Sequence, residues 1–468
     1  MSKRFLKRRW PWLTAAGVIV LALLATFVEI RILGDWDRRP LGSVAAIEAL
    51  RERDDLNVLF LVVDTLRAER LGSYGYERDT SPRLDRVAAS GVRFARHLAQ
   101  SSWTKASMAS LWTGLYPART GIGRFDQVVP EEARMPAEML REAGFQTVGL
   151  YRNGWVAPTF GFDQGFDVYK RPIRAPFPRE IRRENPTVSD AGTDEGLVEA
   201  AVEFLRLRGK QRWFLYLHLM DVHEYLYDEE SALFGIHYSD VYDNSIRWAD
   251  GVIEVLLSYL AHLGYLDNTL IVLTSDHGEA FAERGFEGHA RKVYRETTET
   301  PFLISFPFRL EPGVVVETRT RNVDVWPTIF DLLGLEVPAT DGRSRLPEIL
   351  ASARGEALPE SGEPAIAHLD QTWGRPGREA QPTVAVSEGP LRYVRVVQEN
   401  GVIQQLYDAS DDPKEFRDRA GEDPETLERL SALADAYLEL RPEWGEAPTR
   451  ELGELELNQL RALGYAVP

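Results

Sequence analysis

The fold of this chain is decided by residues 57–64, Asn57-Val58-Leu59-Phe60-Leu61-Val62-Val63-Asp64. Such a near-continuous apolar and β-branched run is typical of a strand buried on both faces of a parallel sheet. Similar runs recur at 147–151, 213–219, 269–274 and 302–306, and helical patterns separate them, most clearly at 241–263. The alternation predicts an α/β fold with a predominantly parallel sheet flanked by helices.

The N-terminus predicts a membrane anchor. Five Lys and Arg residues within positions 3–9 precede an uncharged run of 19 residues at 10–28. This length spans a bilayer, and the flanking cations place the N-terminus in the cytoplasm. A cleaved secretory signal is the alternative, but no small-x-small pair closes the run. We therefore expect a single-pass protein of the plasma or inner membrane, with the rest of the chain periplasmic or otherwise extracytoplasmic.

Composition shifts divide the chain into four parts. Residues 1–33 form the basic tail and anchor, 34–55 a polar spacer, 56–345 the main α/β domain, and 346–468 a smaller C-terminal α+β subdomain with a linker. Pro, Gly, Ala and Glu dominate residues 351–385, which reads as a linker or long loop. Strand-like runs follow at 391–397 and 401–406, and the last 50 residues look helical and acidic.

The bulk properties exclude several classes of function. A net charge of −17 argues against a nucleic-acid partner. The absence of cysteine excludes disulfides, thiolate metal sites and cysteine nucleophiles. An apolar content of 44% and a charged content of 27% are ordinary for a globular protein.

Acidic and imidazole side chains follow two of the predicted strands. Asp64 comes directly after the first strand, and Asp276-His277 follow the strand at 269–274. Carboxyl ends of neighbouring parallel strands meet at one edge of a sheet, where ligands bind. Two carboxylates and an imidazole there would suit Mg, Mn, Ca or Zn.

A hydroxyl nucleophile is expected beside this metal site. Thr104 precedes the helical pattern at 105–112, so its oxygen would face the positive end of the helix dipole. A bound cation would favour the alkoxide of this weak nucleophile. The alternative is that Thr104 only caps the helix. The acidic residues elsewhere in the chain favour the nucleophile.

In these motifs the chain resembles the sulfatase family of the alkaline-phosphatase superfamily. The resemblance runs in order through the Asp64 strand and several further segments: Ser81-Pro82-Arg83-Leu84-Asp85-Arg86, Leu111-Trp112-Thr113-Gly114, Gly161-Phe162-Asp163-Gln164-Gly165-Phe166-Asp167, Asp276-His277-Gly278-Glu279, Gly288-His289, Val323-Asp324-Val325-Trp326-Pro327-Thr328, Leu406-Tyr407-Asp408 and Asp412-Pro413-Lys414-Glu415. It implies an alkaline-phosphatase/sulfatase-like fold and a metal-dependent enzyme acting on ester bonds.

Departures from the family pattern affect the chemistry. Thr104 stands where sulfatases have a cysteine or serine that is oxidised to formylglycine, and threonine cannot give that aldehyde, so formylglycine is not expected. Ala106 and Met108 replace the family's proline and arginine, and Thr65 replaces its second carboxylate. A threonine here is similar to the lipoteichoic acid synthase branch, which attacks phosphorus and uses manganese. The resemblance therefore favours phosphoryl- or phosphodiester-type transfer, with sulfuric ester hydrolysis as the alternative.

The resemblance also implies roles for residues around the nucleophile. His223 matches a substrate-contacting histidine, and His289 matches one that protonates the leaving oxygen. Lys105 and Lys292 would offset the negative charge of the substrate, although a lysine is usually a solvated surface group. His218, within an apolar run, is expected to be a satisfied core histidine. The two aspartates of the glycine-rich loop, Asp163 and Asp167, are expected to cap turns.

Together these expectations describe one mechanism. Asp64, Asp276 and His277 hold one divalent ion (Mn, Mg or Ca, with Zn as an alternative) that also contacts Thr104, and Thr104 forms a covalent intermediate. The substrate would be an anionic ester, lipid-linked or in an envelope glycan. The rival hypothesis is a non-catalytic descendant that binds an anionic glycan or lipid head group.

Overall fold

The computed structural model describes residues 37–172, 192–356, 362–454 and 457. Within these ranges no helix is both long and apolar enough to span a bilayer. The predicted anchor at 10–28 lies outside the described residues. The chain divides into two compact units at residue 38, and the described helices and strands belong to the second, Arg39–Pro468.

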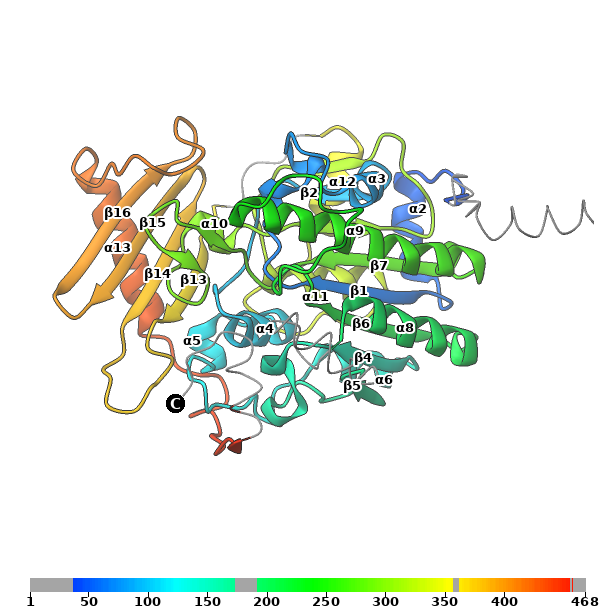
Figure 1. Cartoon of the computed structure of the whole chain (residues 1–468), viewed down its shortest axis with the longest axis horizontal. Helices are drawn as coiled ribbons and strands as arrows, with labels where there is room; N and C mark the ends of the chain where they lie inside the picture. Colours follow the sequence, from blue (N-terminus) through cyan, green and yellow to red (C-terminus); the bar gives the residue numbers. More distant parts are fainter. Residues whose placement is uncertain (1–36, 173–191, 357–361, 455–456, 458–468) are drawn as a thin grey trace, which may run out of the picture. The chain divides into compact units, whose positions relative to one another are not determined.

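An eight-stranded sheet forms the centre of this unit (Figure 1). All its strands run parallel except β10, which pairs antiparallel with both neighbours. The five strands predicted from the sequence are all present in it. In spatial order the strands are β11 (Val314–Val316), β2 (Val92–Phe94), β10 (Phe302–Ser305), β7 (Thr269–Thr274), β1 (Asn57–Val63), β6 (Trp213–Leu219), β4 (Gln146–Tyr151) and β5 (Val168–Lys170).

Strand β1 lies in the middle of the sheet, and all seven of its residues are buried. Val58, Phe60 and Val62 belong to a hydrophobic core that includes residues of α4 (Thr104–Thr113) and α11 (Asn322–Leu332). Alternate side chains point to the opposite face. Helix α8 (Asp194–Arg208) contacts both β4 and β6, and it also contacts α9 (Tyr238–His262). Figure 1 shows the two helices beside the central strands. Burial on both faces is the reason for the unbroken apolar run.

Shorter elements complete the main layers. Two small pairs lie outside the central sheet, β3 (His97–Leu98) with β12 (Thr320–Arg321) and β8 (Ala280–Phe281) with β9 (Glu287–Gly288). The remaining α-helices before the C-terminal sheet are α2 (Val44–Glu48), α3 (Pro82–Ala89), α5 (Pro117–Thr120), α6 (Pro136–Glu142), α10 (Arg295–Thr298) and α12 (Leu346–Ala353). The 3-10 turns are η1 (Ala49–Glu52), η2 (Ala68–Arg70), η3 (Gly72–Tyr74), η4 (Gly154–Val156), η5 (Pro158–Phe160) and η6 (Leu266–Asn268).

A second, antiparallel sheet follows near the C-terminus. Its strands are β13 (Ala365–Asp370), β14 (Pro382–Glu388), β15 (Leu391–Gln398) and β16 (Gly401–Asp408), with α13 (Pro424–Leu438) along it (Figure 1). The strands expected at 391–397 and 401–406 are confirmed. The prediction of a linker or long loop at 351–385 is wrong where β13 and the start of β14 lie. The Pro- and Gly-rich turns around these short strands dominate the composition of residues 351–385 and hide the strands.

The two sheets share a core. One face of the second sheet packs on α13 through Val386, Leu406 and Leu430. Residues of the other face, including Ala385 and Val394, belong to the same hydrophobic cluster as β1. The proposed domain boundary at 345/346 stays a prediction.

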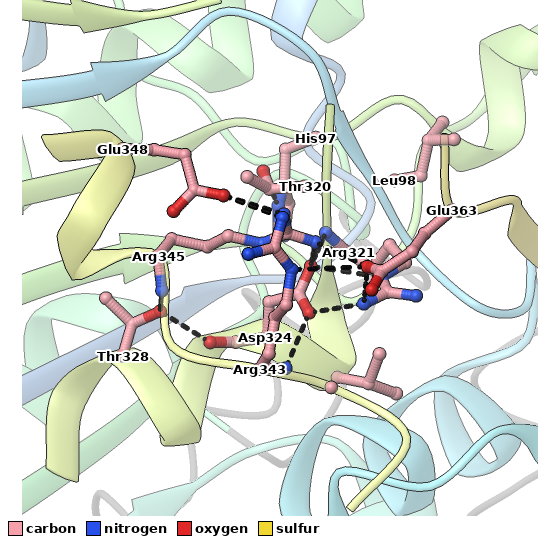
Figure 2. Close-up of polar contacts among 12 residues, drawn as sticks. His97, Leu98, Thr320, Arg321, Asp324, Thr328, Arg343, Arg345, Glu348 and Glu363 are labelled. Atoms are coloured by element: carbon pink, nitrogen blue, oxygen red, sulfur yellow. Dashed lines mark hydrogen bonds and ion pairs between the residues drawn. The ribbon is translucent and has the colours of Figure 1, made fainter. Parts of the chain in front are cut away.

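A buried ionic cluster secures the start of α11. Asp324 accepts hydrogen bonds from the Arg321 side chain (Nη2, 2.7 Å), the Arg343 backbone N–H (3.0 Å) and the Arg345 side chain (Nη2, 2.7 Å). Figure 2 shows these arginines around Asp324, with Glu348 and Glu363 beside them. Paired, hydrogen-bonded charges are the form in which ionised groups are tolerated in a protein interior. The cluster therefore fixes α11, which packs against α4.

Candidate active site

The predicted metal ligands meet at the carboxyl edge of the central sheet. Each of Asp64, Asp276 and His277 offers a ligand atom, and these atoms lie within 4.8 Å of one another. All three side chains are fully buried. They meet because β1 and β7 are adjacent parallel strands, with Val62 level with Thr274, so both chains leave the sheet on the same side.

The carboxylates have unused hydrogen-bonding capacity. Asp64 Oδ1 and Asp276 Oδ2 are buried and accept no hydrogen bond from any residue in the described ranges. Burial opposes ionisation of Asp64, but the hydrogen bond from His218 and electrostatic interactions with the surrounding imidazoles hold its pKa below the usual range. Burial and the nearby charge of Asp64 raise the pKa of Asp276. Buried acceptors without donors are what a coordinated cation would satisfy.

The tautomer of His277 supports the same conclusion. Its Nδ1 lies 2.9 Å from the Gly278 carbonyl oxygen, which can only accept, so Nδ1 carries the proton. Nε2 faces Asp276 Oδ2 at 3.3 Å and Thr104 Oγ1 at 3.1 Å. With Nδ1 bonded to the Gly278 carbonyl, Nε2 is the ring nitrogen that would ligate a cation. The three residues therefore fit a divalent cation.

Thr65, which replaces the second carboxylate of the family pattern, does not restore that ligand. Its Oγ1 donates to the Asp64 backbone carbonyl at 2.6 Å. Its backbone N–H donates to Asp276 Oδ1 at 3.2 Å. Its φ of 62° is unusual for a β-branched residue, and such strain is commonly retained at functional sites. Thr65 thus orients Asp276 through its backbone.

Thr104 is the first residue of α4, and its side chain is fully buried. Trp103 occupies the capping position, so the structure does not support the alternative in which Thr104 is the N-cap. Ser107, one turn on, donates to the Asp276 backbone carbonyl and ties α4 to the end of β7. Ala106 and Met108, the other departures from the family pattern, are buried in the hydrophobic core.

Asn153, which the sequence analysis missed, bridges the nucleophile and the metal ligands. Its Nδ2 lies 2.6 Å from Asp64 Oδ2 and 3.3 Å from Thr104 Oγ1. Its Oδ1 accepts from the Trp155 N–H at 2.8 Å, which fixes the orientation of the amide. The available signal was position, because Asn153 follows β4 by two residues at the same edge of the sheet.

His218 is buried and hydrogen-bonded, as predicted, but it belongs to the site. Its Nε2 donates to Asp64 Oδ2 at 3.0 Å, and its Nδ1 accepts from the Tyr216 hydroxyl at 2.7 Å. It lies level with Val62 on the neighbouring strand, two residues before Asp64. The apolar sequence around His218 concealed this role, because strand β6 is buried on both faces.

His223 and His289 lie together beside the cluster. Their ring centroids are 5.0 Å apart, and the His289 ring stacks on His277 at 4.5 Å. Burial lowers the pKa of His223 to about 4. Burial also disfavours the charged form of His289, but the adjacent Glu279 carboxylate more than offsets this and raises the pKa of His289. Glu279 Oε2 lies 3.2 Å from His289 Nδ1, so Glu279 is a second residue without a predicted role.

The two lysines are placed differently. Lys105 is fully buried, and its Nζ donates to the backbone carbonyls of Arg124 (3.2 Å) and Phe125 (2.9 Å). Lys292 is half-buried, with Nζ 5.4 Å from the centre of the Phe286 ring. Contact of either lysine with substrate stays a prediction.

The aspartates of the glycine-rich loop do not join the metal cluster. Asp167 accepts from the Thr147 N–H at 3.0 Å, at the start of β4, and the Asp163 backbone carbonyl accepts from the Phe166 N–H at 3.1 Å. The Asp163 contact is a local turn, as expected. The Asp167 contact joins residues 20 positions apart, so the Asp167 side chain ties the end of the loop to β4 and does not cap a turn.

The fold and the site define a class of protein. A buried hydroxyl beside a carboxylate–imidazole cluster, at the carboxyl edge of a largely parallel sheet, is typical of cation-assisted enzymes acting on anionic esters. The family profile described as "Sulfatase" matches residues 56–335. A second profile, "N-sulphoglucosamine sulphohydrolase, C-terminal", matches residues 283–441. The chain belongs to the sulfatase family.

The sequences of known sulfatases align with most of this chain. The steryl-sulfatase of Rattus norvegicus is 24% identical over 406 residues, covering 63% of this chain and 70% of the relative. A Delta 4,5-hexuronate-2-O-sulfatase of Bacteroides thetaiotaomicron is 23% identical and covers 85% and 92% respectively. The solved phosphonate monoester hydrolase of Silicibacter pomeroyi has a TM-score of 0.63 at 21% identity, over 82% of this chain and 95% of that one. At that identity the likeness shows the fold.

These relatives bear on the reaction. Sulfatase-family enzymes hydrolyse sulfate esters and typically bind a divalent metal, for which the Asp64 cluster is the candidate site. The comparisons favour sulfuric ester hydrolysis, which the sequence analysis ranked second, over phosphoryl transfer. The threonine nucleophile, the kinship with lipoteichoic acid synthases and any transferase activity rest on the residues of this chain alone.

Proposed function

We propose that this protein hydrolyses an anionic ester with Thr104 as nucleophile. A sulfate ester is the first candidate substrate, because the relatives are sulfatases. One observation supports the proposal above all. The Thr104 hydroxyl lies 3.1 Å from His277 Nε2, at the edge of a fully buried cluster of potential metal ligands. Helix α4 presents this hydroxyl from its first turn, where the helix dipole favours negative charge.

The chain's own groups suit each step. Thr104 loses its proton to solvent, and its oxygen bonds to the sulfur or phosphorus atom while the bond to the leaving oxygen breaks. Asn153 donates toward the reacting oxygen and steadies the negative charge that builds there. A divalent cation held by Asp64, Asp276 and His277 would supply positive charge that favours the alkoxide. Attack by water on the same central atom, with one of its protons passing to His289, then breaks the bond to Thr104, whose oxygen regains a proton from solvent.

His289 would protonate the leaving oxygen. The Glu279 carboxylate beside it favours the charged imidazolium and raises the pKa of His289, which extends the acid form to higher pH. His223, packed against His289, has a pKa of about 4 and is therefore uncharged near neutral pH, suited to hydrogen bonding with the substrate. Lys105 and Lys292 remain proposed substrate contacts.

A phosphate diester or a phosphonate is the second candidate substrate. The specific observation is Thr104 itself, because without an aldehyde the covalent intermediate must be released by a second attack on the central atom. A phosphonate monoester hydrolase shares the fold. An alcohol in place of water in the second step would make the enzyme a transferase, as the similarity to lipoteichoic acid synthases implies.

Location and cofactor are part of the proposal. Residues 10–28 would anchor the protein in the plasma or inner membrane with the catalytic domain outside the cytoplasm. The ion would be Mn, Mg or Ca, with Zn as the alternative. The substrate would be lipid-linked or part of an envelope glycan. The rival, a non-catalytic binding protein, is disfavoured by the three ligands that remain, Asp64, Asp276 and His277, and by the positioned Thr104 hydroxyl.

A substrate panel with variants at Thr104 tests the proposal. Thr104→Ala should abolish turnover of aryl sulfates, phosphodiesters and phosphonates while leaving the thermal unfolding temperature and ion binding largely intact. Thr104→Ser, which keeps the hydroxyl, should retain activity. Full activity of the alanine variant on any substrate of the panel would show that another group is the nucleophile.

A further inference from the structure

The segment between β6 and α9 exposes apolar side chains beside the site. It begins with residues that include His223 and continues to the first residue of α9. Four large apolar side chains on it are exposed, Tyr227 (38%), Leu233 (56%), Ile236 (88%) and Tyr238 (40%). We refer to Tyr225, Tyr238 and Phe281, with Ile236, as the aromatic wall. Exposed apolar side chains gathered on one segment often mark a binding surface.

Tyr225 connects the aromatic wall to the reacting groups. Its hydroxyl donates to Glu279 Oε2 at 3.1 Å, and Glu279 pairs with His289. Its φ of 54° places a bulky residue in the left-handed region, a strained conformation that is retained where the local geometry matters. The strained backbone therefore holds an aromatic ring next to the proposed acid.

The wall extends outward from Tyr225. The Tyr238 ring lies 5.2 Å from the Tyr225 ring and 5.0 Å from the Phe281 ring. The two tyrosine hydroxyls lie 2.6 Å apart, which fixes the rings relative to each other. Ile236, two residues before Tyr238, is the most exposed large apolar residue of the described chain. Ring contacts thus lead from Tyr225, beside the Glu279–His289 pair, to the exposed Tyr238, which Ile236 precedes by two residues.

The charge of this segment is negative, and the arginines packed on it from other elements are paired with carboxylates. Arg67 and Arg70 lie over the Phe281 ring and Arg78 over the Phe234 ring. Their partners are Glu283, Asp243 and Asp240 respectively. Residues 220–246 contain no lysine or arginine. Asp228, Glu229 and Glu230 are exposed on it. Like charges repel an approaching polyanion and reduce its local concentration, whereas a substrate with one negative charge and a neutral remainder is affected far less.

We propose that the aromatic wall binds the apolar leaving group of a singly charged ester, so that the substrate is an aryl or alkyl ester and not a polysulfated glycan. This rests on the proposed function. The apolar group would lie along Tyr238 and Ile236 while its ester oxygen faces His289.

A chain-length series tests the substrate class. We would measure kcat/KM of the full-length protein for 4-alkylphenyl sulfates and phenyl phosphonates of increasing alkyl length. The wild type should gain about two- to threefold per methylene, as partial burial of each group predicts. In Tyr238→Ala and Ile236→Ser the loss should grow with chain length and flatten the series.

Tyr259→Ala is the matched control. Tyr259 is on the same helix and equally exposed (42%), but 21 residues along, about 30 Å at 1.5 Å per residue. Its chain-length dependence should equal that of the wild type. Glu229→Lys should raise kcat/KM for a polysulfated glycan several-fold at low salt only.

Several results would overturn the inference. One is a wild-type series without length dependence, or one unchanged in Tyr238→Ala and Ile236→Ser. Another is a polysulfated glycan that the wild type prefers to the long-chain esters. A third is that Tyr238→Ala and Ile236→Ser weaken binding to phosphatidylcholine vesicles but leave the dependence of kcat/KM on alkyl length unchanged. That result would make the surface a membrane contact. No turnover of any ester by the wild type would instead refute the proposed function.

Discussion

Asn153→Ala separates support of the nucleophile from metal binding. Asn153 Nδ2 contacts Thr104 Oγ1 at 3.3 Å and Asp64 Oδ2 at 2.6 Å. Losing a preorganised donor to developing negative charge lowers kcat by about 100- to 1000-fold, or about 2.7–4 kcal/mol. Because the contact with Thr104 is long, we expect the lower end, about 100-fold.

Metal affinity should fall less in the same variant. Asp64 keeps its hydrogen bond from His218 at 3.0 Å, so its carboxylate stays oriented. Loss of one supporting hydrogen bond typically weakens metal binding by about 10- to 100-fold, so saturating ion should restore occupancy but not kcat.

The assay is steady-state turnover of an aryl ester at several ion concentrations. Asn268→Ala is the control, because Asn268 ends η6 at the opposite end of β7. If kcat of Asn153→Ala at saturating ion stays within about threefold of the wild type, Asn153 does not stabilise the reacting oxygen, and our interpretation of the 3.3 Å contact is wrong.

Three further outcomes are expected. If His289 is the acid, kcat/KM should fall as pH rises through its pKa, because the imidazolium loses its proton. Glu279 raises that pKa against the effect of burial, so Glu279→Gln should move this alkaline limb of the pH profile to lower pH. A limb that does not move would show that His289 is not the acid. Chelation of the ion should abolish turnover and lower Tm, because an ion at 100 times its Kd adds about 2.7 kcal/mol to the free energy of unfolding. An unchanged Tm after chelation, together with no ion bound when it is added back, would contradict the metal site. Asp324→Ala removes the carboxylate that the buried Arg321 and Arg345 share. Because Arg321 keeps Glu363 and Arg345 keeps Glu348, we expect the low end of the cost of breaking a buried pair, about 3 kcal/mol in urea unfolding. A loss below about 1 kcal/mol would show that the cluster in Figure 2 is not stabilising.

Much of the site could be predicted from strand endings. Asp64 and Asp276 directly follow buried apolar runs, and any pair of adjacent parallel strands brings such residues to one edge. Thr104 could be predicted because it begins a helical pattern. Asn153 and His218 could not, because one lies in a turn without a distinctive motif and the other within an apolar strand.

The amino-acid sequence by itself determined the α/β class, the sulfatase-family motifs, the candidate metal ligands and the replacement of the usual nucleophile by Thr104. These are local properties, set by burial pattern and residue type. Only the tertiary structure decided the antiparallel direction of β10, the turn of Asn153 and His218 toward Asp64, and the contact of Tyr225 with Glu279. Each of these depends on which strands become neighbours and at what register, and pairing between distant segments is decided by packing of the whole core, not by the residues on either side.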